Sequence, residues 1–92
     1  MIRVQEFLPE ALAGIIQKAP LTPEKVAFAW RMAVGPAVDK VTTIELRDRV
    51  LHVKARDAAW RREVERSTGV IRRRLEDLLG KGIVRELNVT LS

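Results

Sequence analysis

Residues 42–60 read TTIELRDRVLHVKARDAAW, and this stretch carries the patterns that decide the fold. Thr42–Leu46 and Val50–Ala55 are rich in β-branched residues and alternate apolar with polar side chains, as half-buried strands do. Residues 47–49 (RDR) lie between the two strands and predict a hairpin turn. Asp57 follows the second strand and is placed to cap a helix. The stretch therefore predicts a β-hairpin that leads directly into a helix.

Downstream of Asp57, apolar side chains recur at every third or fourth position, which predicts one long helix from Ala58 to about Leu79. The apolar stripe of this helix comprises Trp60, Val64, Ser67, Ile71, Leu75 and Leu78. The glycines of residues 80–82 (GKG) end the helix. Residues Val84–Leu91 alternate in polarity again and predict the last strand.

Upstream of the hairpin, the spacing of apolar residues predicts two helices. The first spans Val4–Ala19, and because of Pro9 it either begins near Leu8 or is kinked at the proline. Thr22 is placed as the N-cap of the second, with Pro23 at its first position, and this helix is expected to run to about Val34. Gly35 and the proline after it form a stop signal, and a short irregular or helical turn follows through Asp39.

The predicted order of elements is α-α-β-β-α-β, which defines a small α+β fold. Strands that alternate in polarity bury one face of their sheet, so the helices are expected to pack together on one face of a three-stranded sheet. A chain of 92 residues supports one modest core, which predicts a single domain over residues 1–92. Trp30 and Trp60 lie on apolar stripes and are both expected in the core.

Basic side chains are concentrated in the second half of the chain. The whole chain has 17 Lys and Arg against 12 Asp and Glu, and residues 47–92 hold twelve of the basic and seven of the acidic residues. Such asymmetry indicates an anionic partner, most often nucleic acid. Arginine supplies most of these charges, and a GC-rich genome would also produce that bias.

Two groups of basic residues are candidates for contact with nucleic-acid phosphates. At about 100° per residue, Arg62, Arg66 and Arg73 project within about 40° of one another on the predicted long helix. The alternative is a solvated helix face with i,i+3 and i,i+4 ion pairs. The second group lies at and after the hairpin turn and comprises Arg47, Arg49, Lys54 and Arg56. Its alternative is a charged turn that keeps an exposed edge soluble.

Phe28 and Met32 project from the second helix on the side opposite its main apolar stripe. They are candidates for a patch that binds a protein partner, because Met and aromatic residues often anchor interfaces. The alternative is that the first helix packs on them.

Several classes of activity are excluded by composition and motif. The chain has no Cys, and His52, its one histidine, has no nucleophile or metal ligand at recognisable spacing. No phosphate-cradling glycine loop is present. We therefore expect no catalytic residues, no metal, no cofactor and no small-molecule substrate. No uncharged run exceeds seven residues, which predicts no membrane span and a cytoplasmic protein.

The spacing of particular residues resembles the DciA-like family of bacterial proteins. The matching features are Trp30-x3-Val34-Gly35, Thr42, the strand Val50–Val53, Ala59-Trp60 and a last strand near Val84. The resemblance covers residues 24–91 and implies a KH-like domain that binds the replicative helicase DnaB, contacts DNA and helps load the helicase.

The residues themselves leave two other functions open, an RNA-binding KH-like module and a structural protein-interaction domain. The chain lacks the G-x-x-G loop with which KH modules clamp RNA. With both tryptophans expected inside, no stacking platform is available for bases. Binding to DNA is therefore expected to be weak, driven by phosphates and sensitive to salt.

Overall fold

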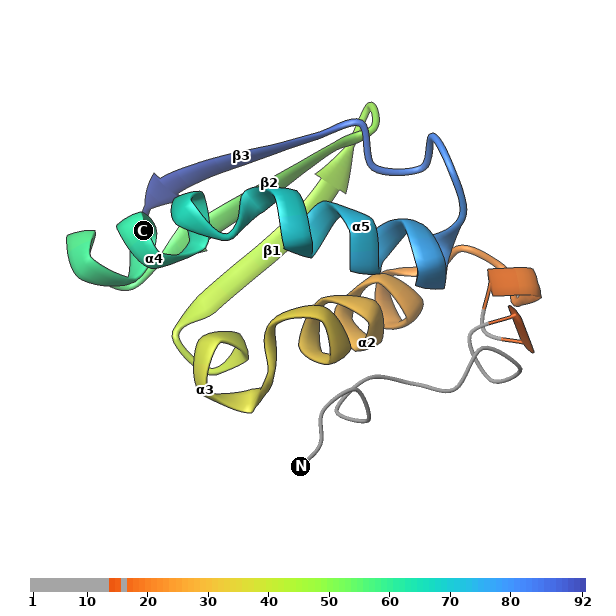
Figure 1. The fold of residues 1–92 in the computed structure, drawn as a ribbon, viewed down its shortest axis with the longest axis horizontal. Helices are drawn as coiled ribbons and strands as arrows, with labels where there is room; N and C mark the ends of the chain where they lie inside the picture. The colour runs from red at the N-terminus through yellow and green to blue at the C-terminus, as the bar shows by residue number, and fades with distance from the viewer. Residues whose placement is uncertain (1–13, 16) are drawn as a thin grey trace.

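The computed structural model describes residues 14–15 and 17–92 (Figure 1). The helix expected over Val4–Ala19 lies mostly outside the described residues, although Gly14, Ile15, Gln17 and Lys18 are helical. The remaining elements follow in the order α2, α3, β1, β2, α4, α5 and β3.

The three strands form one mixed sheet with β2 (Val50–Ala55) in the centre. β1 (Thr42–Arg47) pairs with β2 in antiparallel orientation, and β3 (Glu86–Leu91) pairs with β2 in parallel orientation. The two hairpin strands lie where the sequence predicts them. The last strand begins two residues later than expected, after the Arg85 amide donates to the Arg49 carbonyl at 2.7 Å.

The hairpin turn consists of Asp48 and Arg49, which have φ values of 50° and 67°. Positive φ at both central residues is the conformation of a type I′ turn, whose twist matches that of the flanking strands. Neither residue is glycine, so both side chains make the left-handed backbone conformation unfavourable in free energy. The turn positions Arg47 opposite Val50 and sets the register of the hairpin.

Helix α2 (Pro23–Val34) begins and ends where predicted. The Thr22 hydroxyl accepts a hydrogen bond from the Lys25 amide at 3.1 Å, and Pro23 occupies the first turn. Gly35 ends the helix with a φ of 87°, which glycine adopts readily. The short helix α3 (Pro36–Asp39) then forms the expected helical turn.

The prediction of one helix over residues 58–79 is wrong, because the chain forms two helices there, α4 (Ala58–Arg66) and α5 (Thr68–Leu79). Ser67 separates them with φ −99° and ψ 9°. The Thr68 hydroxyl donates to the carbonyls of Glu65 at 2.9 Å and Val64 at 3.3 Å, and such bonds bend helices. Asp57 caps α4 as predicted, accepting from the Trp60 amide at 3.0 Å.

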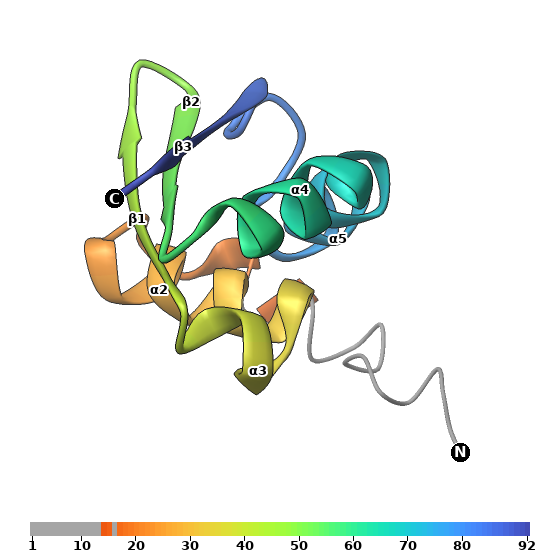
Figure 2. The same ribbon diagram turned by 90° about the vertical axis from the view of Figure 1, so that its left-hand side faces the viewer.

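The core lies between one face of the sheet and the helices. Leu51, Val53 and Ala55 of β2 are fully buried. Helices α2 and α5 pack on each other, α4 contacts β2 and β3, α2 contacts β1, and α5 contacts β3. Figure 2 shows the helices gathered on one side of the sheet. The other face presents mostly polar side chains to solvent, from Thr43 and Glu45 on β1 to Asn88 and Thr90 on β3. The α+β, KH-like fold with helices on one face is therefore as predicted.

The two tryptophans differ in their environment. Trp30 is 1% exposed, as expected, and its Nε1 donates to the Thr42 hydroxyl at 3.0 Å. Trp60 is half-buried and lies outside the core cluster, so its expected core position is wrong. The reason is its place in the first turn of α4: Val64, one turn later, is the residue of this helix that reaches the core.

Candidate nucleic-acid and partner interface

The four basic residues at and after the hairpin turn fall into two separate groups, because β2 runs between them. Arg47 and Arg49 lie at the tip of the hairpin, whereas Lys54 and Arg56 lie at the far end of β2. Five residue steps of about 3.3 Å separate the ends of this strand, about 16 Å in total. The two pairs therefore form separate basic groups at opposite ends of β2.

At the tip, acidic residues accompany the basic ones. The Arg47 Nε lies 3.4 Å from a carboxylate oxygen of Glu45, and both side chains are exposed. Arg49 and Lys81 line a hollow of about 400 Å³ together with Asp48. Lys81 is a basic residue that the sequence did not place here, because it follows α5. The carboxylates lower the positive potential of the tip.

At the far end of β2, Lys54 and Arg56 are joined by Lys40, which follows α3. The three cations line a hollow of about 200 Å³ with Val41, Thr42, Thr43 and Ser92. We call this hollow the basic notch. Its lining contains no acidic side chain, and within the described part of the chain none of its three cations makes an ion pair. Lys40 was missed because it lies in the half of the sequence with no net charge.

The three arginines expected to form one row lie on two helices. Arg62 and Arg66 belong to α4, Arg73 belongs to α5, and all three are exposed. The angle calculated for a single straight helix does not apply across the break at Ser67. Arg66 lies 3.5 Å from a Glu63 carboxylate oxygen, an exposed i,i+3 pair that is worth little to stability.

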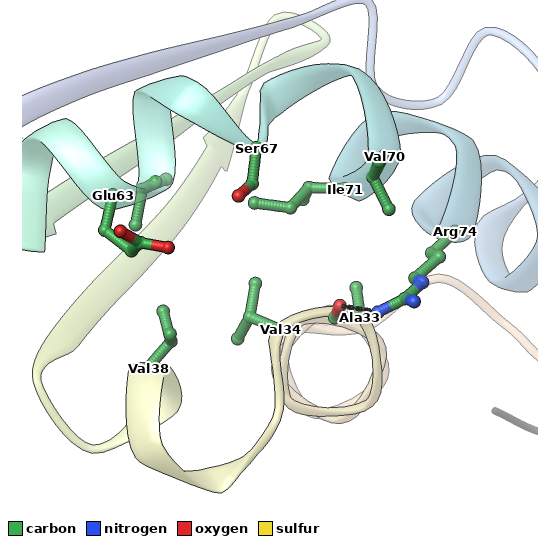
Figure 3. A pocket seen from close by; sticks show the side chains of 9 residues that line it. Ala33, Val34, Val38, Glu63, Ser67, Val70, Ile71 and Arg74 are labelled. Atoms are coloured by element: carbon green, nitrogen blue, oxygen red, sulfur yellow. Dashed lines mark hydrogen bonds between the residues drawn. The ribbon is translucent and has the colours of Figure 1, made fainter. Parts of the chain in front are cut away.

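Arg74 has a structural role that the sequence does not reveal. Its Nη1 donates to the Ala33 carbonyl at 3.0 Å, in the last turn of α2 (Figure 3). The last carbonyls of a helix lack partners within the helix and carry its negative dipole end, so a cation there is favourable. Arg74 therefore joins α5 to α2.

A groove of about 310 Å³ lies beside this contact, between the carboxyl end of α2 with α3 and the junction of α4 and α5. Figure 3 shows Val34 and Val38 facing Glu63, Ser67 and Ile71 across it. Val70 lies at its border and is 53% exposed. The groove is largely apolar, with Glu63 and Arg74 as the charged residues in its lining.

Phe28 and Met32 lie on α2 as the sequence predicts, and they differ in exposure. Phe28 is 43% exposed, whereas Met32 is half-buried and packs against the core cluster. The alternative that the first helix covers them concerns residues that are mostly outside the described part of the chain. Phe28 is thus the more accessible of the two for a partner.

His52 lies on the polar face of the sheet, as expected from its position in the strand. It pairs with Asn88 across β2 and β3, and the Asn88 Nδ2 lies 3.3 Å from its Nδ1. Among residues 14–15 and 17–92, no group of three His, Cys, Asp or Glu side chains is arranged to hold a metal ion. In the same residues, no helix combines the length and apolar character needed to cross a bilayer.

The fold and surface define a small KH-like α+β domain that exposes cations at both ends of its sheet and an aromatic side chain on α2. The family model described as "Dna[CI] antecedent, DciA" matches residues 3–89, and the chain therefore belongs to the DciA family. This family is associated with DNA replication and the loading of the helicase DnaB, and it is not a known enzyme family. A search of curated proteins gave no significant match.

Proposed function

We propose that this protein is a non-enzymatic adaptor that binds the replicative helicase DnaB in the bacterial cytoplasm and contacts DNA through its basic surface to promote helicase loading. The observation that carries the proposal is the family match over residues 3–89. The exposed cations of the described surface support the DNA contact, since phosphate contacts provide most of the non-specific affinity for DNA.

The helicase contact is assigned to Phe28 with Met32 on α2. An aromatic side chain that is 43% exposed has apolar area to lose on binding, as interface anchors do. Met32 stands one turn further along the same helix and extends this apolar surface. It also packs against the core, so Phe28 is the cleaner position to change.

A pull-down with purified DnaB, with and without DNA, tests the helicase contact. Phe28→Asp is expected to weaken capture at least tenfold while leaving the circular-dichroism spectrum unchanged; Met32→Ser serves as the second variant. Val70→Asp is the matched control, because Val70 is similarly exposed but lies on α5. Unchanged capture by Phe28→Asp would refute the helicase contact through Phe28 and Met32. Loss of capture with Val70→Asp alone would instead indicate a helicase contact at the groove beside α5.

The DNA contact is tested by the salt dependence of binding to a short duplex. Each phosphate contact contributes about 0.9 to the slope of log K against log salt. We expect Arg62→Gln and Arg73→Gln each to lower the slope by about that amount. Arg66→Gln is expected to lower it less, because Arg66 already pairs with the Glu63 carboxylate. A slope near zero for the unmodified protein would refute DNA contact. Preference for structured RNA without helicase capture would favour the RNA-binding alternative.

A further inference from the structure

We infer that the basic notch is a binding site for one phosphodiester group of a nucleic-acid strand. The inference rests on the proposed function and deepens it, because it assigns a place in the fold where a backbone phosphate is held. The site includes Lys40, which the sequence did not indicate as a candidate.

Three separate segments supply the cations of the notch. Lys40 lies between α3 and β1, Lys54 lies in β2, and Arg56 lies between β2 and α4. Lys54 lies fourteen positions after Lys40, and their convergence results from the antiparallel register of the hairpin. Three positive charges around one hollow repel one another, and a phosphate oxygen between them relieves this repulsion.

Backbone hydrogen bonds fix the walls of the notch. The Arg56 amide donates to the Val41 carbonyl at 2.9 Å, which extends the hairpin ladder beyond the Thr42–Ala55 pair. The Lys40 amide donates to the Pro36 carbonyl at 3.1 Å. Because the backbone of the notch is ordered before a ligand arrives, little backbone entropy is lost on binding.

Hydroxyl donors complete the chemistry of the site. Thr43 stands directly opposite Lys54 on the polar face of the sheet, so their side chains are neighbours there. Thr43 and Ser92 are exposed, and both line the notch. Lysine and arginine side chains with hydroxyl groups are the usual protein partners of nucleic-acid phosphates.

The notch differs from the hollow at the hairpin tip in its charge. The tip hollow combines Arg49 and Lys81 with Asp48, whereas the notch is lined by three cations and no carboxylate side chain. Both hollows are open to solvent and contain basic residues. The notch is therefore the stronger anion site of the two, and Lys81 at the tip is a suitable control for general positive charge.

The experiment measures binding of a fluorescent single-stranded dodecathymidylate to the full chain at about 0.1 M salt. One phosphate contact to a single strand contributes about 0.7 to the slope of log K against log salt, which at about 0.1 M salt amounts to about fivefold in affinity. We therefore expect an affinity loss of about this factor from each of Lys40→Gln, Lys54→Gln and Arg56→Gln. Lys81→Gln removes the same charge at the other end of β2 and is expected to lower the affinity less than twofold. All four side chains are exposed, so the variants should retain the fold.

Amide NMR shifts provide a second readout. The Thr43, Lys54 and Arg56 amides are expected to shift with the oligonucleotide and to shift less in Lys40→Gln. Titration with inorganic phosphate distinguishes a site for free phosphate from a site for a strand. A free carboxylate at Ser92 would add a negative charge to the lining, so the chain is measured with and without a short uncharged extension after Ser92.

The outcomes separate this inference from the proposed function. Equal losses of affinity in the notch variants and in Lys81→Gln would overturn the assignment of a phosphate site to the notch. They would leave intact the proposal of DNA contact through a diffuse basic surface. Shifts with inorganic phosphate but none with the oligonucleotide would overturn the assignment to a strand. Absence of oligonucleotide binding by the unmodified protein would overturn the notch as a site for a single strand, and absence of duplex binding as well would refute the DNA contact itself.

Discussion

Replacing Thr42 by valine tests the polar contact that joins α2 to the sheet. The Thr42 hydroxyl accepts from the Trp30 Nε1 at 3.0 Å and donates to the Val38 carbonyl at 2.9 Å. Valine has nearly the same shape as threonine but can neither accept nor donate a hydrogen bond. It therefore leaves the indole N–H of Trp30, a side chain that is 1% exposed, without a partner. A buried group left unsatisfied costs about 1–3 kcal/mol.

The gain from a buried methyl group offsets part of this cost, so we expect Thr42→Val to lower the free energy of unfolding by about 1–2 kcal/mol. In a domain of this size, each kcal/mol shifts Tm by about 4–8 °C, which predicts a drop of about 5–15 °C. Urea unfolding followed by circular dichroism, together with a thermal scan, measures both quantities.

Thr43→Val is the matched control, because Thr43 is the next residue on the same strand and faces solvent. The same chemical change there is expected to alter the free energy of unfolding by less than about 0.5 kcal/mol. A double-mutant cycle with Trp30→Phe completes the test: without the indole donor, Thr42→Val should cost about 1 kcal/mol less. Equal effects at Thr42 and Thr43, or additive effects of Thr42→Val and Trp30→Phe, would refute the reasoning.

Three further variants test other parts of the fold by the same unfolding measurements. Arg49→Gly should raise the free energy of unfolding by about 0.5–1 kcal/mol, because glycine adopts a φ of 67° without strain; destabilisation would contradict the type I′ turn. Asp57→Ala should lower it by about 1 kcal/mol through loss of the α4 cap, and no change would show that the bond to the Trp60 amide contributes nothing. Arg74→Leu should lower it by about 1 kcal/mol more than Arg72→Leu, because Arg74 alone of the two bonds the Ala33 carbonyl; equal effects would argue against the link between α5 and α2.

Much of the secondary structure could be predicted because its signals are local. Thr22 with Pro23 starts α2, Gly35 ends it, and Asp57 starts α4, all through bonds to groups within four residues. The break at Ser67 was missed, although residues 67–69 (STG) carry a signal for it. Serine and threonine hydroxyls compete for helix carbonyls and glycine weakens a helix, and the Thr68 hydroxyl makes such bonds at the break.

The spatial grouping of the candidate cations could not be read from the sequence, because proximity in sequence is not proximity in space. Arg49 and Lys54 are five residues apart in an extended strand and lie at opposite ends of it, whereas Lys40 and Lys54 meet in the notch. Arg74 resembles its neighbours in sequence, yet it holds α5 to the end of α2. No count of charges distinguishes a cation bound to a carbonyl from one free to meet a phosphate.

The sequence by itself determined where along the chain the strands and most helices lie, which face of the sheet is buried, and the excess of positive charge. These follow from periodicity and from capping residues that act within one turn or one strand. Only the tertiary structure decided which cations converge, which stay exposed and how deeply Trp60 is buried. The reason is that such contacts depend on the register between strands and on how helices pack, which bring together residues far apart in the chain.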